Sequence, residues 1–272
     1  MGIVNVTPDS FSDGGRFLDA DAAIRHGRQL IAEGADILDI GGESTRPGAE
    51  PVSEEDEIAR VVPVIQGLAA TGVPLSVDTR HGGVMTAALA AGATILNDVA
   101  ALREPGALAV AAASNAWICL MHMRGDPGGM QTAPTYGDVV AEVMDFLAKR
   151  IRTCEEAGIE RHRIAIDPGI GFGKTLEHNL ALLRHLKRFG DLGCPVLLGV
   201  SRKSFIAQLS RGEPATGRLP GSLAAALAGV EAGARVLRVH DVAATRQAVD
   251  VWRALSPAPA VAAYATELGI GA

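Results

Sequence analysis

Short apolar runs alternate with longer amphipathic stretches along the whole chain. The apolar runs have the length and composition of strands, whereas the stretches between them have the periodicity of helices. The predicted strands are Gly2–Val6, Asp36–Ile40, Pro74–Val77, Thr94–Asn97, Ala116–Met121, Arg163–Ile166, Pro195–Val200 and Arg235–Val239. The clearest predicted helices are Asp21–Glu33, Ser53–Ala70, Gly137–Ala157 and Ser222–Ala232. Strands that alternate with helices predict an α/β fold with a parallel sheet.

The number of these units decides between two α/β architectures. Eight β/α units in 272 residues match the expected size of a TIM (β/α)8 barrel, so we expect a single domain over residues 1–272. A doubly wound open sheet is the alternative. The first predicted strand begins at the second residue, so we expect that a segment before it is nearly absent.

Helix boundaries carry local signals. Ser53, followed three residues later by Asp56, is typical of an N-cap with an acidic first turn. Units that combine glycine and alanine mark helix ends that lead into parallel strands. These units are Glu33-Gly34-Ala35, Ala91-Gly92-Ala93, Glu156-Ala157-Gly158 and Ala232-Gly233-Ala234.

Composition narrows the kind of protein. The chain is 48% hydrophobic, which is enough for a large core, and its net charge of -6 argues against a nucleic-acid-binding surface. Cys119, Cys154 and Cys194 lie far apart and partly in apolar runs, so we predict that they pack in the core. No signal peptide opens the chain, and no apolar run approaches the roughly 18 residues of a membrane span. We therefore expect a soluble protein of the reducing cytoplasm.

The segment Asp167–Thr175 resembles a phosphate-binding loop but matches neither standard motif. A Walker A loop would require glycine in place of Pro168, and a dinucleotide-binding loop would require glycine in place of Lys174. Binding of ATP or NAD by this backbone is therefore not predicted. What remains is a carboxylate, Asp167, at the end of a buried strand and before glycines that let a ligand approach the backbone.

Polar side chains gather where the predicted strands end. In chain order they are Asn5, Asp39, Asp78, Asn97 with Asp98, His122 after Met121, Asp167, Lys203, and Arg238 with His240. The carboxyl ends of barrel strands form one mouth, so we expect these side chains to meet there, beside two polar, glycine-rich loops at residues 7–15 and 41–48. Taken alone, Asp78 or Asp241 fits a helix N-cap. A whole ring of polar groups, however, is unfavourable unless a polar ligand binds there.

These polar residues separate into two chemical groups. The first group is Asp78, Asn97 and Asp167. It can hydrogen-bond a flat heterocycle that carries several N–H donors. The second group is Asn5, Arg46, Arg238 and His240, which suits phosphate or pyrophosphate. Lys203 is placed to bridge the two groups.

The remaining histidines are assigned to the surface or to packing. They are His26, His81, His162, His178 and His185, which lie in or near predicted helices. The chain contains no HxH, HExxH or CxxC spacing. Tightly held zinc or another transition metal is therefore not predicted.

The polar strand ends lie in motifs that resemble those of the dihydropteroate synthase family, the folate-pathway enzymes targeted by sulfonamides. The motifs are residues 2–15, 41–48, 76–79, 97–98, 120–123, 167–174, 201–204 and 238–241. They follow the family's order and span nearly the whole chain. Their joint occurrence is far more specific than any one of them.

The resemblance implies a transferase that joins 6-hydroxymethyl-7,8-dihydropterin pyrophosphate to p-aminobenzoate by a dissociative, SN1-like route. The implied pterin-binding residues are Asp78, Asn97, Met121, Asp167, Phe172 and Lys203. The implied p-aminobenzoate-binding residues are Phe11, Thr45, Pro47, Lys203 and Ser204. The implied pyrophosphate-binding residues are Asn5, Thr45, Arg46, Arg238 and His240, with Mg²⁺ at Asn5. The implied catalytic residues are Asp78, Asp167, Lys203 and Arg238.

The resemblance also implies a homodimer through the late helices, and the apolar stretch Leu223–Val230 is compatible with it. Residues 47–53 contain no insertion of the kind found in mobile sulfonamide-resistance enzymes, so we predict ordinary sulfonamide sensitivity. The rival functions are a pterin-binding methyltransfer module and a paralogue that binds pterin without turnover. Residues 9–15 and 201–204 argue against the first rival, and the presence of the catalytic side chains argues against the second.

Overall fold

Eight parallel strands form a closed barrel in the computed structural model, which describes residues 1–6, 16–44, 52–125, 130 and 134–256. The strands are β1 Gly2–Asn5, β2 Leu38–Gly41, β3 Leu75–Asp78, β4 Ile95–Asp98, β5 Trp117–Met121, β6 Ile164–Asp167, β7 Val196–Leu198 and β8 Ala234–Leu237, hydrogen-bonded in that order. The ring closes between β8 and β1, because Ile3 N donates to Val239 O at 3.0 Å and Val239 N donates to Met1 O at 2.9 Å. The predicted TIM barrel is confirmed and the open-sheet alternative is wrong.

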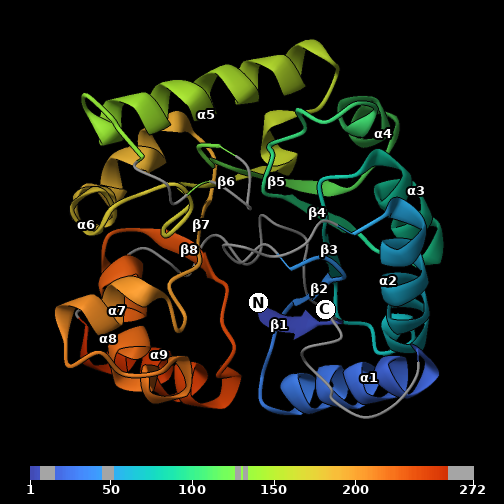
Figure 1. Cartoon of the computed structure of the whole chain (residues 1–272), viewed down its shortest axis with the longest axis horizontal. Helices are drawn as coiled ribbons and strands as arrows, with labels where there is room; N and C mark the ends of the chain where they lie inside the picture. Colours follow the sequence, from blue (N-terminus) through green and yellow to red (C-terminus); the bar gives the residue numbers. More distant parts are fainter. Residues whose placement is uncertain (7–15, 45–51, 126–129, 131–133, 257–272) are drawn as a thin grey trace.

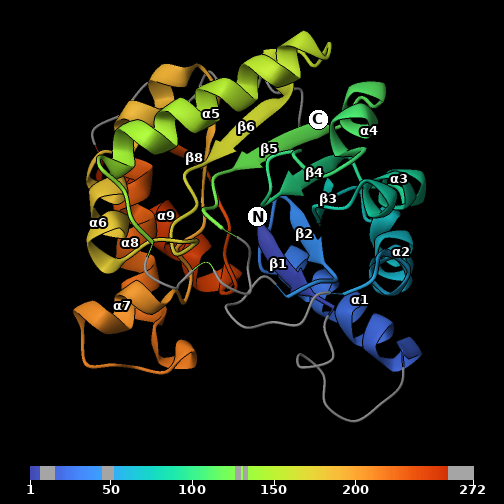
Figure 2. The same ribbon diagram turned by 45° about the horizontal axis from the view of Figure 1, so that its top comes forward.

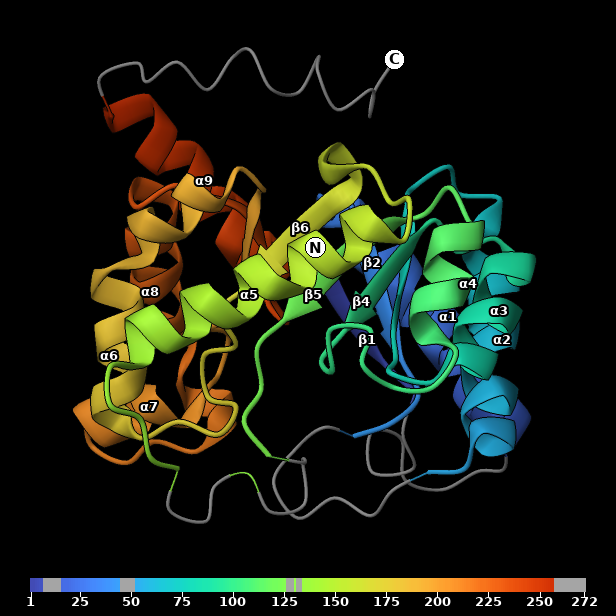
Figure 3. The ribbon, with the colours of Figure 1, turned by 90° about the horizontal axis from the view of Figure 1, so that it is seen from above.

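The helices form an outer layer around the strands (Figure 1). They are α1 Arg16–Ala32, α2 Glu54–Ala69, α3 Gly82–Ala91, α4 Ala107–Ala113, α5 Val139–Glu156, α6 Leu176–Arg184, α7 Ser204–Leu209, α8 Leu219–Glu231 and α9 Val242–Leu255. Short 3₁₀ turns lie at η2 Arg161–Arg163, η3 Leu186–Leu192 and η4 Ala215–Gly217. Seen from above, α1 to α4 lie on one side of the strands and α6 to α9 on the other, with α5 across the front (Figure 3).

Local sequence signals set several of these boundaries. Ser53 Oγ accepts a hydrogen bond from Asp56 N at 3.1 Å, so the predicted cap of α2 is confirmed. Gly92 ends α3 with a φ of 115°, a left-handed conformation that suits glycine. The connection from β7 to β8 departs from the prediction, since it contains α7 and α8 where one helix was expected.

The core lies between the barrel and its helices, as the alternation of strand residues requires. Val77, Leu96 and Leu120 face outward and are completely buried among helix side chains. Their polar neighbours in the same strands, such as Ser76 and Asn97, point into the barrel. The three cysteines are buried and unpaired, so their predicted role in packing is confirmed.

The view in Figure 2 follows the strands between the two groups of helices. The eight strands are parallel, so their carboxyl ends lie at the same mouth of the barrel. The side chains that follow each strand are therefore brought together there. Among the described helices, none has the length and apolar character needed to cross a membrane.

Candidate active site

Arg238 joins four strands at the centre of the barrel mouth. Its Nε lies 2.6 Å from Asp39 Oδ2, and its Nη2 lies 2.6 Å from Asp78 Oδ2. Asn97 Nδ2 donates to the same Asp39 oxygen at 3.1 Å. Side chains from β2, β3 and β4 therefore meet the arginine that follows β8. This convergence is what the polar strand ends predicted.

The guanidinium of Arg238 forms ion pairs with two carboxylates, Asp39 and Asp78. Asp39 is completely buried, and the Asp78 side chain is 12% exposed. Within the described part of the chain, the Oδ1 atoms of both carboxylates are buried without a hydrogen-bond partner. Burial, assisted by the charge of Asp39 and opposed by Arg238, raises the pKa of Asp78 to about 7. The two free oxygens are acceptors available to the N–H groups of a ligand.

Lys203 and Asp167 form the opposite wall. A β-carbon placed on Gly199 would lie 3.8 Å from Lys203 Nζ, 3.9 Å from Asp167 Oδ2 and 4.0 Å from Arg238 Cβ. The absence of a side chain at Gly199 therefore leaves room where three predicted residues meet. Burial raises the pKa of Asp167, and burial lowers the pKa of Lys203 to about 8 although Asp167 opposes the change.

An apolar cluster lies apart from the main core beside these charges. It consists of Val99, Met121, Met123 and Met130, with Phe172 packed against them. The Phe172 ring centre is 4.6 Å from Lys203 Nζ, which is a cation–π contact. Met121 and Phe172 were predicted to line a heterocycle pocket, and the structure brings them together. Val99, Met123 and Met130 were not predicted, because apolar residues after a strand do not differ from core residues in sequence.

The turns after β7 and β8 are fastened to each other. Ser201 Oγ lies 3.2 Å from His240 N and 3.0 Å from His240 Nδ1. Arg202 donates to the two carboxylate oxygens of Asp241 at 3.0 and 2.5 Å. Asp241 occupies the N-cap position of α9, as the N-cap interpretation expects, but its side chain makes no cap bond and pairs with Arg202 instead. The N-cap interpretation is wrong for Asp78, because the N-cap of α3 is His81.

Other predicted residues are tested only in part. Asn5 ends β1, partly exposed and opposite Gly41, and Ser204 is the exposed first residue of α7. Both therefore lie at the mouth. Four predicted site residues, Phe11, Thr45, Arg46 and Pro47, lie outside the described residues. The p-aminobenzoate and pyrophosphate sets accordingly stay predictions at those positions.

Asp39 was predicted to lie at the mouth but was assigned to neither ligand-binding group. Its position in β2, between Leu38 and Ile40, carried a signal: a carboxylate inside an apolar strand points into the barrel. Asp98, in contrast, was predicted among the polar strand ends of the mouth but bonds to the backbone of the next turn. Its two carboxylate oxygens accept hydrogen bonds from Ala100 N at 2.6 Å and Leu102 N at 2.7 Å, so it shapes the turn after β4.

A second polar cluster lies beside the mouth, between β2 and β3. Ligand atoms of Glu43, Glu57 and His81 lie within 4.8 Å of one another, a spacing that a cation site would also have. Arg80 already pairs with Glu43 through two contacts of 3.2 Å, and His81 Nδ1 lies 2.8 Å from Glu57 Oε2. Glu43 also accepts from Val52 N at 3.4 Å, whereas Glu57 Oε1 is buried without a hydrogen-bond partner among the described residues. The cluster fastens the chain where it leaves β2 and returns to α2.

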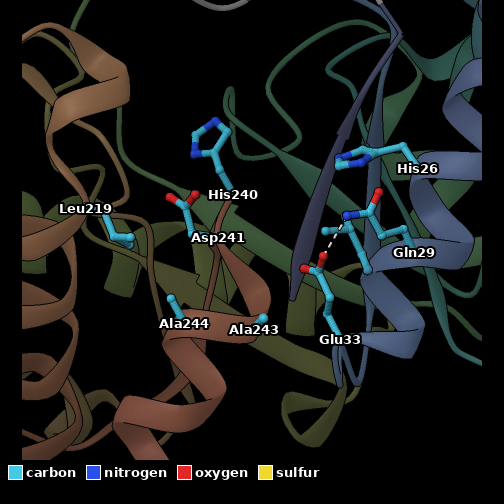
Figure 4. A pocket seen from close by; sticks show the side chains of 9 residues that line it. His26, Gln29, Glu33, Leu219, His240, Asp241, Ala243 and Ala244 are labelled. Carbon is cyan, nitrogen blue, oxygen red and sulfur yellow. Dashed lines mark hydrogen bonds between the residues drawn. The ribbon is translucent and has the colours of Figure 1, made fainter.

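A hollow of about 300 Å³ lies between α1 and α9 (Figure 4). Of the predicted site residues, His240 alone lines it. On its α1 side, Gln29 Nε2 donates to Glu33 Oε1 at 2.7 Å. Because those two polar groups bond each other, the hollow offers few free groups to a ligand, and we place the active site at the barrel mouth.

Comparisons with known proteins agree with this geometry. Residues 1–240 match the family described as pterin binding enzyme. Dihydropteroate synthase of Neisseria meningitidis serogroup C is 54% identical over 259 residues, covering 94% of this chain and 92% of that protein. The structure of the Xanthomonas albilineans dihydropteroate synthase with 4-aminobenzoic acid has a TM-score of 0.90, with 55% identity and coverages of 95% and 93%. The same enzyme with 7,8-dihydropteroate gives a TM-score of 0.84, 48% identity and the same coverages.

The fold and the mouth residues define an enzyme of the pterin-binding TIM-barrel class. The predicted site residues that the structure describes lie at or just after the carboxyl ends of the strands, as this class requires. At these identities and coverages, the chain belongs to the dihydropteroate synthase family of transferases.

Proposed function

We propose that this enzyme joins 6-hydroxymethyl-7,8-dihydropterin pyrophosphate to p-aminobenzoate, giving 7,8-dihydropteroate and pyrophosphate. The observation that carries the proposal is the network of Arg238 with Asp39, Asp78 and Asn97, facing Asp167 and Lys203. It combines carboxylate acceptors for a heterocycle with a cation for an anionic leaving group. Family membership supports the same reaction.

The pterin half is assigned to the acceptors and the apolar cluster. The free Oδ1 of Asp78 and the carboxylate of Asp167 suit the paired N–H groups of an aminopterin ring. Asn97 is 5% exposed, and its amide nitrogen already donates to Asp39. Its amide oxygen is therefore the group that we assign to the ring. Met121 and Phe172 would cover the faces of the ring.

The leaving pyrophosphate is assigned to Arg238, His240 and Asn5, together with Arg46. Mg²⁺ is part of this proposal. Asn5 offers one neutral oxygen at the end of β1, which fits an ion that keeps several waters and takes its other ligands from phosphate oxygens. When bound, the ion would neutralise charge that develops on the leaving group.

We propose a dissociative order of bond changes. The bond between the pterin methylene carbon and the pyrophosphate oxygen breaks first, and its electron pair leaves with the pyrophosphate. The arylamine nitrogen of p-aminobenzoate then attacks the cationic methylene and releases one proton. Asp78 and Asp167 favour the cation, and Arg238 stabilises the departing anion. No side-chain nucleophile is required.

The p-aminobenzoate half is assigned to Lys203 and Ser204, with Phe11, Thr45 and Pro47. Lys203 carries the positive charge that a carboxylate needs, and Ser204 N lies at the start of α7. Sulfonamides, which are arylamines of similar shape, are proposed to compete for this position.

The assembly and location of the protein are also proposals. We propose a homodimer through the late helices, supported by exposed Leu209, Val251 and Leu255 on α7 and α9. Sedimentation at micromolar concentration tests it, and a monomer at all concentrations would contradict it. A cytoplasmic location is supported by the three free, buried cysteines.

Product formation tests the proposed reaction against its rivals. The protein is incubated with dihydropterin pyrophosphate, p-aminobenzoate and Mg²⁺, and dihydropteroate is measured by chromatography. The synthase predicts product in the wild type and its loss in Asp167→Asn. Pterin binding without product would favour the non-catalytic paralogue, and methyl transfer to a corrinoid would favour the other rival.

A further inference from the structure

Lys174 is a buried cation that the proposed reaction does not use. It is 3% exposed, and its Nζ lies 3.0 Å from His122 Nδ1, 3.3 Å from His122 O and 2.9 Å from Phe172 O. An ammonium group has three N–H donors, and each finds an acceptor here. Lys174 therefore points into the protein and has no donor left for a phosphate, although the segment resembles a phosphate loop.

These contacts fasten the loop after β6 to the end of β5. A β-carbon on Gly169 would collide with His122 O, and one on Gly173 would collide with Arg124 O. Both glycines have left-handed φ values, 69° and 60°, so another residue would be strained as well as crowded. Tyr136 Oη adds a hydrogen bond to Gly173 O at 2.9 Å. The two backbones are thus held in contact at both ends of residues 169–173.

The fastened loop carries groups that face the proposed pterin site. Phe172 packs in the apolar cluster of the mouth, and its ring lies 4.6 Å from Lys203 Nζ. Lys203 Nζ also donates to Ile170 O. Any movement of this loop would therefore move Phe172 and the main hydrogen-bond partner of Lys203.

We infer that Lys174 is a positioning residue for the pterin: it holds residues 169–173 against His122, so that Phe172 and Lys203 are in place before the ring binds. The inference rests on the proposed function for the identity of the ligand. It assigns Lys174 no contact with the substrate.

The charge of Lys174 gives this role a dependence on pH. Burial lowers the pKa of Lys174 to about 7, with Asp167 opposing the change and Lys203 adding to it. Burial, and then Lys174, lowers the pKa of His122 to about 3, so its ring stays neutral and accepts through Nδ1. Above pH ~7 a neutral amine has two N–H donors for three acceptors, and one contact is lost.

The test compares Lys174→Met with Lys187→Met, which changes an exposed lysine of η3. Calorimetry measures the Kd of dihydropterin pyrophosphate at pH 6 with Mg²⁺ and without p-aminobenzoate. Lys174→Met is expected to raise this Kd about tenfold, as the loss of charged hydrogen bonds implies, whereas Lys187→Met changes it less than about twofold. In steady state, Lys174→Met is expected to raise the pterin KM and change kcat much less. An unchanged Kd in Lys174→Met would overturn the inference.

The pH readout separates positioning from a general loss of structure. The ratio of the variant Kd to the wild-type Kd is expected to be large at pH 6 and to shrink by pH 8.5, since the wild type also loses the ammonium. Asp78 titrates in both proteins, so its contribution cancels in the ratio, whereas Asp167 and Lys203 interact with Lys174 and contribute to the change in the ratio. A ratio that stays constant with pH would overturn the inference.

Two further measurements cover the remaining outcomes. If circular dichroism shows that Lys174→Met is unfolded, His122→Leu, which removes the side-chain acceptor, replaces it, and a Kd equal to that of the wild type would then contradict the inference. If the wild type binds no pterin, the proposed function fails. Hydrogen exchange of residues 169–173 without ligand still tests the fastening, which predicts faster exchange in Lys174→Met than in Lys187→Met.

Discussion

At the scale of single residues, Arg238 decides the electrostatics of the mouth. It is the partner of both Asp39 and Asp78, and these carboxylates in turn raise its pKa despite its burial. Removing it would leave Asp39 completely buried without a cation. Removing one partner of a buried ion pair usually destabilises the fold by more than the intact pair stabilises it, because the desolvation cost of the remaining charge is no longer offset.

Arg238→Met is therefore expected to lower the free energy of unfolding by about 3 kcal/mol at pH 8, measured by urea denaturation. The control, Arg188→Met on the surface of η3, should change it by less than about 0.5 kcal/mol. Adding Asp39→Asn to Arg238→Met should recover part of the loss. A double variant as unstable as the sum of the single variants would contradict a direct pairing.

The shifted pKa values of Asp78 and Lys203 predict a bell-shaped pH profile. Asp78 must be ionised to accept pterin N–H groups, so activity is lost as pH falls through about 7. Lys203 must be protonated, so activity is lost as pH rises through about 8, and loss of the Lys174 ammonium above about 7 adds to this alkaline limb. The profile is measured as kcat/KM for dihydropterin pyrophosphate, which reports groups of the free enzyme.

Lys203→Arg provides the control for this profile. An arginine keeps its proton throughout the range, so the part of the alkaline limb that Lys203 causes should disappear, while the part that Lys174 causes and the acid limb stay. An acid limb near pH 4 in the wild type would contradict the raised pKa of Asp78.

At the scale of elements, the turn between β7 and α7 shows how the backbone aims a side chain. Arg202 has a φ of 58°, a left-handed conformation that non-glycine residues adopt at a cost. Its backbone N donates to Ser222 Oγ at 2.9 Å, and its side chain pairs with Asp241. With Arg202 turned toward Asp241, the next residue, Lys203, points into the barrel.

Two substitutions separate the backbone of Arg202 from its side chain. Arg202→Ala loses the ion pair and keeps the strain, whereas Arg202→Gly loses the ion pair and relieves the strain. Arg202→Gly should therefore be more stable than Arg202→Ala by about 1 kcal/mol in urea denaturation. If alanine proves the more stable of the two, the left-handed conformation is not the source of strain.

The elements themselves could largely be predicted from the sequence. Apolar runs gave the eight strands, and Ser53 gave the start of α2, because both signals are local. The extra helix α7 was missed, since it has only six residues and no capping side chain. Arg202 with Asp241 was missed because the two residues are 39 positions apart and nothing in a pattern reports such a pairing.

At the scale of the whole molecule, closure of the barrel brings polar residues that are far apart in the sequence into one site. Residues as far apart as Asp39 and Arg238 meet because every strand ends at the same mouth. That convergence could be predicted, and so could most of its members. The partner of each charge could not be predicted, because it depends on side-chain directions that only the closed ring fixes.

The proposed p-aminobenzoate site predicts inhibition of the whole enzyme by sulfonamides. A sulfonamide is expected to raise the KM for p-aminobenzoate and leave kcat unchanged, since both arylamines would occupy the position beside Lys203 and Ser204. Steady-state rates at several p-aminobenzoate concentrations measure this. Inhibition too weak to detect at high micromolar sulfonamide, or inhibition that p-aminobenzoate does not relieve, would contradict the prediction.

In the proposed reaction, this mouth couples loss of pyrophosphate to formation of a bond with p-aminobenzoate. The most direct measurement follows pyrophosphate and dihydropteroate together in one reaction, with and without p-aminobenzoate. We expect one pyrophosphate for each dihydropteroate and sustained release only when p-aminobenzoate is present. Sustained pyrophosphate release without p-aminobenzoate, or no product despite tight pterin binding, would contradict it.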